Sequence, residues 1–199
     1  GNHDKCRFIS LAGGAVSWNE SDKAAGWTRH IGVTADGDAT KEAHAYRMAM
    51  LLEMINFTIP GVPCVYQGDE YGESGANDPD NRDMMMFEGY NDYQTKEYAQ
   101  TKALMQYRRG SMPLMYGDIL SLYVDDAAWV FLRHYMGEWV VVAMNVRGEA
   151  TSVKATLPAF VKCGGLEKAV ATEGADVKCL GEGNLEVVLP AYGYVIVSK

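Results

Sequence analysis

The stretch that decides the fold is Thr40–Phe57, TKEAHAYRMAMLLEMINF, followed almost directly by residues 60–72, PGVPCVYQGDEYG. The first part predicts a helix, because alanine, methionine and leucine dominate it and Pro60-Gly61 ends it. Its apolar residues lie nearly all the way round, as in a helix that packs on a sheet with neighbours beside it. The apolar run Val62–Tyr66 predicts a short strand buried on both faces. A helix followed by a buried strand is typical of a parallel α/β sheet.

A long polar segment follows, from Gly68 to about Gln94, and its glycine, asparagine and aspartate residues predict an extended loop. Loops of this kind are often functional. Residues Thr95–Arg109 predict a second helix. From about Leu114 the sequence changes to short runs of β-branched and aromatic residues, with Gly137-Glu138 as a hairpin signal. The predicted strands are Leu120–Val124, Trp129–Tyr135, Trp139–Val146, Thr151–Leu157, Leu185–Leu189 and Tyr192–Val197.

We therefore predict an α/β region over residues 1–112 and an antiparallel all-β sandwich over residues 113–199. The α/β region supplies one full strand and two helices, which do not make a closed layer. A helix as apolar as residues 41–57 needs further chain to cover it. Gly1 stands before a polar triplet without a preceding strand or cap signal and indicates a cut end. We expect either a missing N-terminal portion or self-association through the exposed core to cover the helix.

Composition and charge limit the partners of the chain. Its 199 residues are 48% hydrophobic and 22% charged, which predicts a globular protein with a core. With 26 acidic and 18 basic residues the formal net charge is −8, which does not suit a phosphate backbone. The longest apolar run is far shorter than the roughly 18 residues of a membrane span. We expect no nucleic acid and no membrane as partners.

The four cysteines, Cys6, Cys64, Cys163 and Cys179, are too few and too scattered for a disulfide scaffold and lack a C-x-x-C metal spacing. We expect free thiols that pack as small apolar residues. A bond between Cys163 and Cys179 across neighbouring strands is the alternative.

Two polar clusters carry the candidate chemistry. Asn2-His3-Asp4 places an amide, an imidazole and a carboxylate side by side, and Arg7 follows. In the long loop, Asp78 and Arg82 predict a planar polar fork that hydrogen-bonds neighbouring sugar hydroxyls. Aromatic residues that border this loop have faces suited to stacking on sugar rings; they are Tyr66, Tyr71, Phe87, Tyr90 and Tyr93.

The same loop is acidic, and calcium is the alternative ligand to consider. Residues 69–92 contain eight acidic side chains against the single cation Arg82. Carboxylates and amides suit Ca²⁺, but the glycine and the closing glutamate of an EF-hand are absent after Asn81. We predict no metal and no cofactor for this chain, and leave calcium as an option for its parent protein.

Three motifs in this order resemble the C-terminal part of the α-amylase family of glycoside hydrolases. Asn2-His3-Asp4 with Arg7-Phe8 resembles the family's segment at the end of the seventh barrel strand, residues 60–72 resemble the eighth strand and its exit, and Asn77–Arg82 resembles the Asp-Pro-x-Asn-Arg loop. The resemblance covers nearly the whole chain. It implies that residues 1–112 are an α/β fragment, the last strands and helices of a TIM-type (β/α)8 barrel, and that residues 113–199 are the family's C-terminal β-sandwich.

The resemblance also implies roles for the polar residues. Family members cleave α-glucans such as starch by a retaining mechanism with an aspartate nucleophile, a glutamate acid/base and a third carboxylate that stabilises the transition state. Asp4 matches the third carboxylate, and His3 matches the residue that hydrogen-bonds the sugar at the cleavage position. Asp78 and Arg82 match contacts to the next sugar on the non-reducing side. Asn2 and Arg7 complete the predicted substrate-binding set, although Arg7 also matches a framework position.

In this family the nucleophile and the acid/base lie on the fourth and fifth strands, upstream of the position of Gly1. We therefore expect this polypeptide alone to hydrolyse no starch, and expect an α-glucan oligosaccharide as ligand and a secreted or periplasmic parent enzyme. A transglycosylase of the same family, a non-catalytic carbohydrate-binding fragment and a structural subunit are the alternatives. The motifs do not distinguish α-1,4 from α-1,6 linkages.

Overall fold

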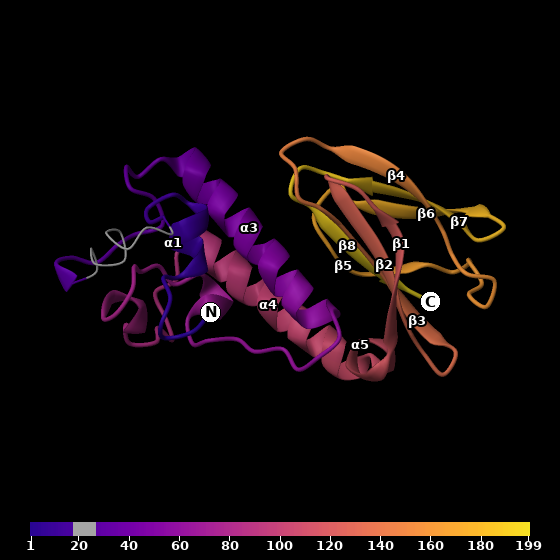
Figure 1. Ribbon diagram of the computed structural model, residues 1–199, viewed down its shortest axis with the longest axis horizontal. Coiled ribbons are helices and arrows are strands. Elements are labelled where there is room, and N and C mark those ends of the chain that lie inside the picture. The colour runs from indigo at the N-terminus through magenta and orange to yellow at the C-terminus, as the bar shows by residue number, and fades with distance from the viewer. Residues whose placement is uncertain (18–26) are drawn as a thin grey trace. The chain divides into compact units, whose positions relative to one another are not determined.

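The computed structural model describes residues 1–17 and 27–199 and divides into two compact units (Figure 1). The first unit comprises Gly1–Asn56 and Pro63–Lys102, and the second comprises Phe57–Val62 and Ala103–Lys199. Within the described residues, no helix is both long enough and apolar enough to cross a membrane.

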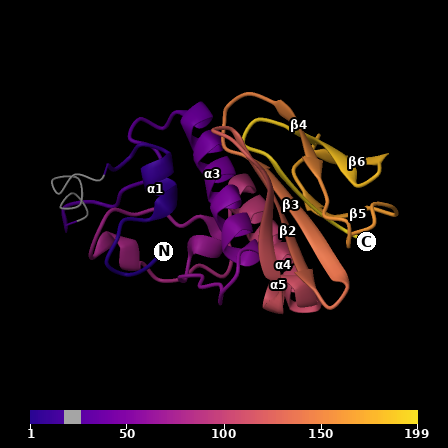
Figure 2. The same ribbon diagram turned by 45° about the vertical axis from the view of Figure 1, so that its right-hand side comes forward.

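The first unit is built on two long helices, α3 (Ala39–Thr58) and α4 (Asp92–Gly110), which run side by side in Figures 1 and 2. Both were predicted to within three residues at each end. Phe57 and Thr58 of α3 and residues 103–110 of α4 belong to the second unit. The short helix α1 (Phe8–Ala12) places Ile9 in a core with Tyr46 and Ala49 of α3. The Tyr46 ring stacks on Tyr93 with ring centroids 5.0 Å apart.

Two single-turn 3-10 helices shape the long loop between these helices. The first, η2 (Asp69–Tyr71), is bounded by Gly68 and Gly72, both in the left-handed region. A side chain at Gly68 would collide with the carboxylate of Glu73, so glycine is required there for space as well as for its φ of 92°. The second, η3 (Asp80–Arg82), lies inside the loop motif found in the sequence.

The predicted strand over Val62–Tyr66 is wrong as an element of secondary structure. No described strand pairs with this segment, and Val62 is 94% exposed. A strand is held by hydrogen bonds to a neighbouring strand, and the described part of the first unit supplies none. The apolar pattern of Val62–Tyr66 therefore forms no strand in the part of the chain that the structure describes.

The second unit contains the predicted antiparallel sandwich. One sheet has the strand order β1-β2-β3-β8-β5 and the other the order β4-β7-β6; Figure 1 labels these strands. Side chains from both sheets form one apolar core that includes Val130, Leu132, Val141, Val153 and Val187. The strands are β1 (Asp118–Val124), β2 (Ala128–Tyr135), β3 (Glu138–Asn145), β4 (Thr151–Thr156), β5 (Glu167–Ala171), β6 (Asp176–Gly181), β7 (Asn184–Leu189) and β8 (Tyr194–Ser198).

Two strands, β5 and β6, were missed from the sequence. Both are edge strands, and β5 is mostly exposed, so neither shows a clear apolar alternation.

The hairpin between β2 and β3 turns at Met136-Gly137, one residue earlier than predicted. Both turn residues have positive φ, 47° and 90°, as a two-residue type I′ turn requires.

The expectation of four free thiols is wrong for two of them. Cys163 and Cys179 form a disulfide with their Cα atoms 6.0 Å apart. The sandwich brings the loop that carries Cys163 against β6, which carries Cys179, and only the tertiary fold creates that proximity. Cys6, which is buried, and Cys64, which is exposed, are not part of a disulfide.

Buried arginines stabilise the end of α3 within the second unit. Arg108 of α4 donates to the carbonyls of Phe57, Ile59 and Gly61 at 2.8, 3.2 and 2.5 Å. Arg133 of β2 donates to the carbonyl of Thr58 and, at 3.2 and 2.8 Å, to the carbonyls of Leu114 and Gly117, which flank the short helix α5 (Met112–Tyr116). These guanidinium groups satisfy carbonyls that the helix end leaves without backbone partners.

Candidate functional site

The N-terminal segment and η3 meet in the first unit and bring four predicted site residues together. Arg82 Nη2 lies 3.2 Å from Asp78 Oδ2 and 3.8 Å from Asp4 Oδ1. His3 Nε2 lies 3.3 Å from the same oxygen of Asp4. The side chains of Asp4 and His3 are 66% and 62% exposed and those of Asp78 and Arg82 are each 42% exposed, so all four are accessible to a ligand.

Asn2, the fifth predicted residue, acts on the backbone of this segment. Its Oδ1 accepts a hydrogen bond from the Asp4 N–H at 2.9 Å. This contact closes a tight local turn in the segment that carries His3 and Asp4. The amide of Asn2 is therefore engaged in shaping the segment, although the residue is exposed.

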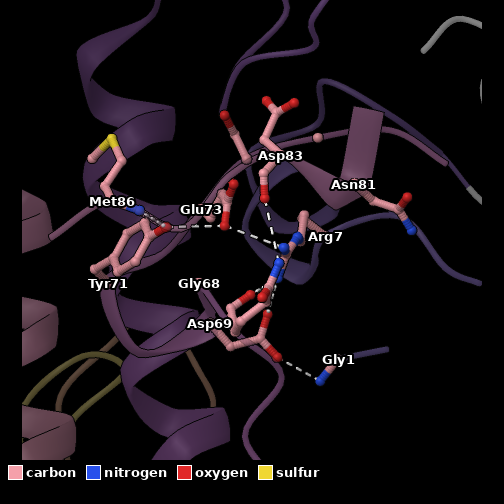
Figure 3. A network of polar contacts seen from close by, with 12 residues as sticks. Gly1, Arg7, Gly68, Asp69, Tyr71, Glu73, Asn81, Asp83 and Met86 are labelled. Carbon is pink, nitrogen blue, oxygen red and sulfur yellow. Dashed lines mark hydrogen bonds and ion pairs between the residues drawn. The ribbon is translucent and has the colours of Figure 1, made fainter. Parts of the chain in front are cut away.

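Arg7, the sixth predicted residue, lies in the interior of the first unit (Figure 3). Its guanidinium donates to the Gln67 carbonyl at 2.6 Å, to Asp69 Oδ1 at 3.1 Å and to Glu73 Oε2 at 3.2 Å. It also lies over the Tyr66 ring, 4.4 Å from the centroid. Because Arg7 is 1% exposed and surrounded by these partners, it is a framework residue in this structure and not the sugar contact that the sequence predicted.

The acids of the long loop therefore do not form one solvated face. Asp69 and Glu73 turn inward to Arg7, and Glu70 accepts a hydrogen bond from the Gly68 N–H at 2.8 Å. Burial raises the pKa of Glu73, while the Arg7 cation and the Tyr71 hydroxyl at 3.0 Å oppose that rise. Burial also raises the pKa of Tyr71 to about 12, so this hydroxyl remains a hydrogen-bond donor at neutral pH.

The loop motif has an inner and an outer half, and sequence reasoning missed the inner one. Asp78 and Arg82 face outward, whereas Asp80 and Asn81 are 6% and 0% exposed. Asp80 Oδ2 accepts hydrogen bonds from the backbone N–H groups of Ile31 at 3.0 Å and Ala76 at 2.6 Å. The sequence did contain a signal for the inner half, because Asp80 and Asn81 are adjacent polar residues inside the motif. Roles were assigned only to the outer residues, Asp78 and Arg82.

Asp80 also belongs to the one group of described side chains with a geometry that resembles a metal site. His30 Nδ1 lies 2.8 Å from Asp80 Oδ1 and 3.2 Å from Asp83 Oδ2, and the ligand atoms of the three residues lie within 4.8 Å of one another. Calcium prefers a shell made of oxygen ligands. An imidazole beside an Asp80 carboxylate whose Oδ2 already accepts two backbone hydrogen bonds does not fit that ion.

Among the aromatic residues that border the loop, exposure separates one from the others. Tyr71 is fully buried, and Tyr66, Tyr90 and Tyr93 are half-buried. Phe87 is 82% exposed. Its neighbour Met86 is held at both backbone groups, because its N–H donates to the Tyr71 hydroxyl at 3.1 Å and its carbonyl accepts from the Tyr90 hydroxyl at 2.8 Å.

Comparison with known proteins finds cyclomaltodextrinases among the relatives of this chain. The chain is 31% identical over 146 residues to a cyclomaltodextrinase of Thermoanaerobacter pseudethanolicus, a match that covers 73% of this chain and 20% of that enzyme. It is 32% identical over 153 residues to a cyclomaltodextrinase of Geobacillus thermopakistaniensis, covering 75% of this chain and 25% of that enzyme. The chain thus spans about a quarter or less of the length of these relatives. No family model matches the chain.

Solved structures agree with the sequence matches. The α-amylase of Geobacillus thermoleovorans, solved in complex with acarbose, superposes with a TM-score of 0.72 at 25% identity, over 100% of this chain and 37% of that enzyme. A debranching enzyme of Nostoc punctiforme superposes with a TM-score of 0.67 at 24% identity, over 80% of this chain and 32% of that enzyme. At this identity the second match supports the fold alone.

Proposed function

We propose, because this chain is a homologue of α-amylase-family glycoside hydrolases, that it forms the C-terminal part of a retaining glycosidase that acts on α-glucans. The observation that carries the proposal is the cluster in which Arg82 contacts both Asp4 and Asp78. Asp4 precedes the other two residues by 74 or more positions in the sequence, and all three side chains are accessible in the first unit. The relatives named above, cyclomaltodextrinases and an α-amylase solved with acarbose, support an α-glucan as the substrate.

In the proposed reaction Asp4 acts through its charge. An ionised carboxylate near the sugar ring stabilises the positive charge that develops in an oxocarbenium-like transition state. His3, in contact with Asp4, donates a hydrogen bond to a hydroxyl of the same sugar. The fork of Asp78 and Arg82 binds two hydroxyls of the next sugar on the non-reducing side, since carboxylates accept and guanidinium groups donate in fixed directions.

The nucleophile and the acid/base of the proposed glycosidase come from chain outside residues 1–199. A retaining mechanism needs two further carboxyl groups about 5 Å apart that flank the scissile bond. The proposal assigns neither role to an acid of this chain, so we expect the 199-residue polypeptide to bind glucan without cleaving it. The Cys163–Cys179 disulfide supports an exported parent enzyme, because such bonds persist in oxidising compartments.

Calorimetry of the 199-residue chain with maltoheptaose tests the binding part of this proposal. We expect measurable binding that Asp78→Asn weakens by about tenfold, the effect of losing one charge-assisted hydrogen bond. Glu173→Gln, which removes an exposed charge from the second unit, is the matched control and should bind normally. An affinity unchanged by Asp78→Asn would remove the fork from the proposal.

The catalytic part is tested on the full-length product of the gene that encodes this chain. Asp4→Asn should lower kcat on a chromogenic maltooligosaccharide by about 10²–10³-fold, as expected for loss of electrostatic stabilisation in a transition state. A full-length protein that binds glucan and hydrolyses nothing would favour the second candidate, a non-catalytic glucan-binding role. The exposed Phe87 ring favours that role as well, because stacking on a sugar requires no chemistry.

A further inference from the structure

A buried amide holds the backbone on both sides of Asp4. Asn81 lies on η3 and is 0% exposed. Its Nδ2 donates to the carbonyl of His3 at 3.0 Å and to the carbonyl of Lys5 at 2.7 Å. These carbonyls belong to the residues immediately before and after Asp4, so a single side-chain nitrogen bridges the backbone on the two sides of this position.

This bridge matters because the Asp4 side chain has little else to fix it. Its carboxylate is 66% exposed, and its ion contacts are His3 at 3.3 Å and Arg82 at 3.8 Å, both with solvent-accessible side chains. Exposed ion pairs contribute little to rigidity, since water competes for both partners. Buried hydrogen bonds to the backbone are stronger constraints, and those of Asn81 set the direction of the Asp4 Cα–Cβ bond.

The η3 turn that carries Asn81 is itself fixed by hydrogen bonds of its other two residues. Asp80, the preceding residue, accepts hydrogen bonds from the backbone N–H groups of Ile31 and Ala76. The following residue, Arg82, adds a hydrogen bond from Nε to the His3 carbonyl at 3.2 Å. The η3 turn therefore connects the Asp4 segment to the segment of Ile31 and to an earlier part of its own loop at Ala76.

We propose that Asn81 is a positioning residue that orients Asp4 toward the sugar by bridging the carbonyls of His3 and Lys5; the catalytic meaning of this inference rests on the proposed function. The role requires two N–H donors on one atom, which the amide supplies. Aspartate has the same shape but presents lone pairs to both carbonyls, so Asn81→Asp replaces two attractions with two repulsions.

The chain offers a matched control in the second unit. Asn145 is also 0% exposed, and its Nδ2 donates to the carbonyls of Glu149 at 2.7 Å and Pro190 at 3.0 Å. Asn145→Asp therefore removes the same pair of buried hydrogen bonds from the same residue type, in a place with no proposed contact to sugar. It reports the cost of the chemical change without the effect on Asp4.

The first measurement is steady-state kinetics of the full-length enzyme. We expect Asn81→Asp to lower kcat by about 10²-fold, the effect of a small misplacement of a reacting group, with a change in KM below threefold. Asn145→Asp should keep the normal kcat at temperatures well below its melting point. If Asn81→Asp does not fold, Asn81→Ser, which retains one donor, carries the same test with a smaller expected drop in kcat. A normal kcat in the variant that folds would overturn the inference.

The second measurement separates this inference from the proposed function. In the 199-residue chain, amide hydrogen exchange at Asp4 should accelerate by about tenfold in Asn81→Asp and stay unchanged in Asn145→Asp. Unchanged exchange in Asn81→Asp would overturn the positioning role alone. The proposed function alone would be overturned if exchange accelerates in Asn81→Asp but the unsubstituted full-length protein has no glycosidase activity.

Discussion

Arg7 and Glu73 form an ion pair with an N–O distance of 3.2 Å in the interior of the first unit, although they are 66 positions apart in the chain. The same guanidinium lies 3.1 Å from Asp69. One cation therefore connects the segment after Asp4 with both sides of the η2 turn, and it does so almost without contact to solvent.

Replacement of Arg7 by alanine should destabilise the chain by about 3–5 kcal/mol, because it leaves two carboxylates without their buried partner. Without the Arg7 cation the pKa of Glu73 rises further in the folded state. A raised pKa of a carboxyl group favours folding at acid pH, so the loss should be smaller at pH 4 than at pH 7. Urea unfolding at both pH values measures the effect. An equal loss for Arg7→Ala and for the exposed control Arg29→Ala would contradict it.

Glu97 should make the chain less stable as the pH rises. Its side chain is 0% exposed, and neither carboxyl oxygen has a hydrogen-bond partner among the described residues. Burial, with the charge of Glu53 as a second cause, raises its pKa from 4.5 to about 9. The folded state then keeps the proton between these values while the unfolded state releases it, so stability falls across this pH range.

The variant Glu97→Gln tests this expectation by removing the titration. Its melting temperature should exceed that of the normal chain by several degrees at pH 8.5 and by much less at pH 5. Glu88→Gln, at an exposed position, should change neither value. A gain of the same size at both pH values would show that Glu97 does not titrate as described.

Arg108 and its neighbour Arg109 should respond differently to the same substitution. Arg108 is 6% exposed and donates to three carbonyls at the end of α3, whereas Arg109 is exposed. A lysine has one nitrogen and does not reproduce the fork of a guanidinium. We expect Arg108→Lys to cost about 2–3 kcal/mol in unfolding free energy, from lost hydrogen bonds to a charged group, and Arg109→Lys to cost almost nothing. Matching losses in chemical denaturation would refute this reading of the helix end.

The Cys163–Cys179 disulfide should stabilise the sandwich by about 3 kcal/mol, the loop-closure entropy expected for a ring of about 15 residues. The sequence separation of the two cysteines is 16. The double variant with serine at both positions should therefore unfold at a lower denaturant concentration. Thiol titration of the native chain gives an independent check, because exposed Cys64 should react at once and buried Cys6 only on unfolding. Four reactive thiols after denaturation without reductant would contradict the bond.

Local patterns in the sequence were sufficient for the two long helices and for most strands. The helix over Ala39–Thr58 was predicted because its apolar composition and the following Pro60-Gly61 are local signals. The strands β2, β3, β7 and β8 were predicted because their residues are β-branched, aromatic and continuous. The edge strand β5 was missed because its pattern of exposure follows from its place at the end of a sheet, which no local pattern encodes.

The candidate site was predicted in part, for the same reason. His3, Asp4, Asp78 and Arg82 were named from motifs, and the structure brings them together. Arg7 was assigned both to the substrate and to a framework position, and it is buried against Asp69 and Glu73. The local sequence does not show whether a polar side chain faces water or an internal partner, because its burial depends on residues distant in the chain.

The sequence by itself determined the family resemblance, the two long helices, the sandwich and the outward-facing charges of the loop motif. Only the tertiary structure decided that Asn81 turns inward to the carbonyls on both sides of Asp4, that Cys163 meets Cys179, and that residues 62–66 pair with no strand among residues 1–17 and 27–199. The physical reason is that each of these depends on a long-range contact. A hydrogen bond, a disulfide and a strand pairing all require a second partner brought close by the folded chain, and a one-dimensional pattern specifies the first partner alone.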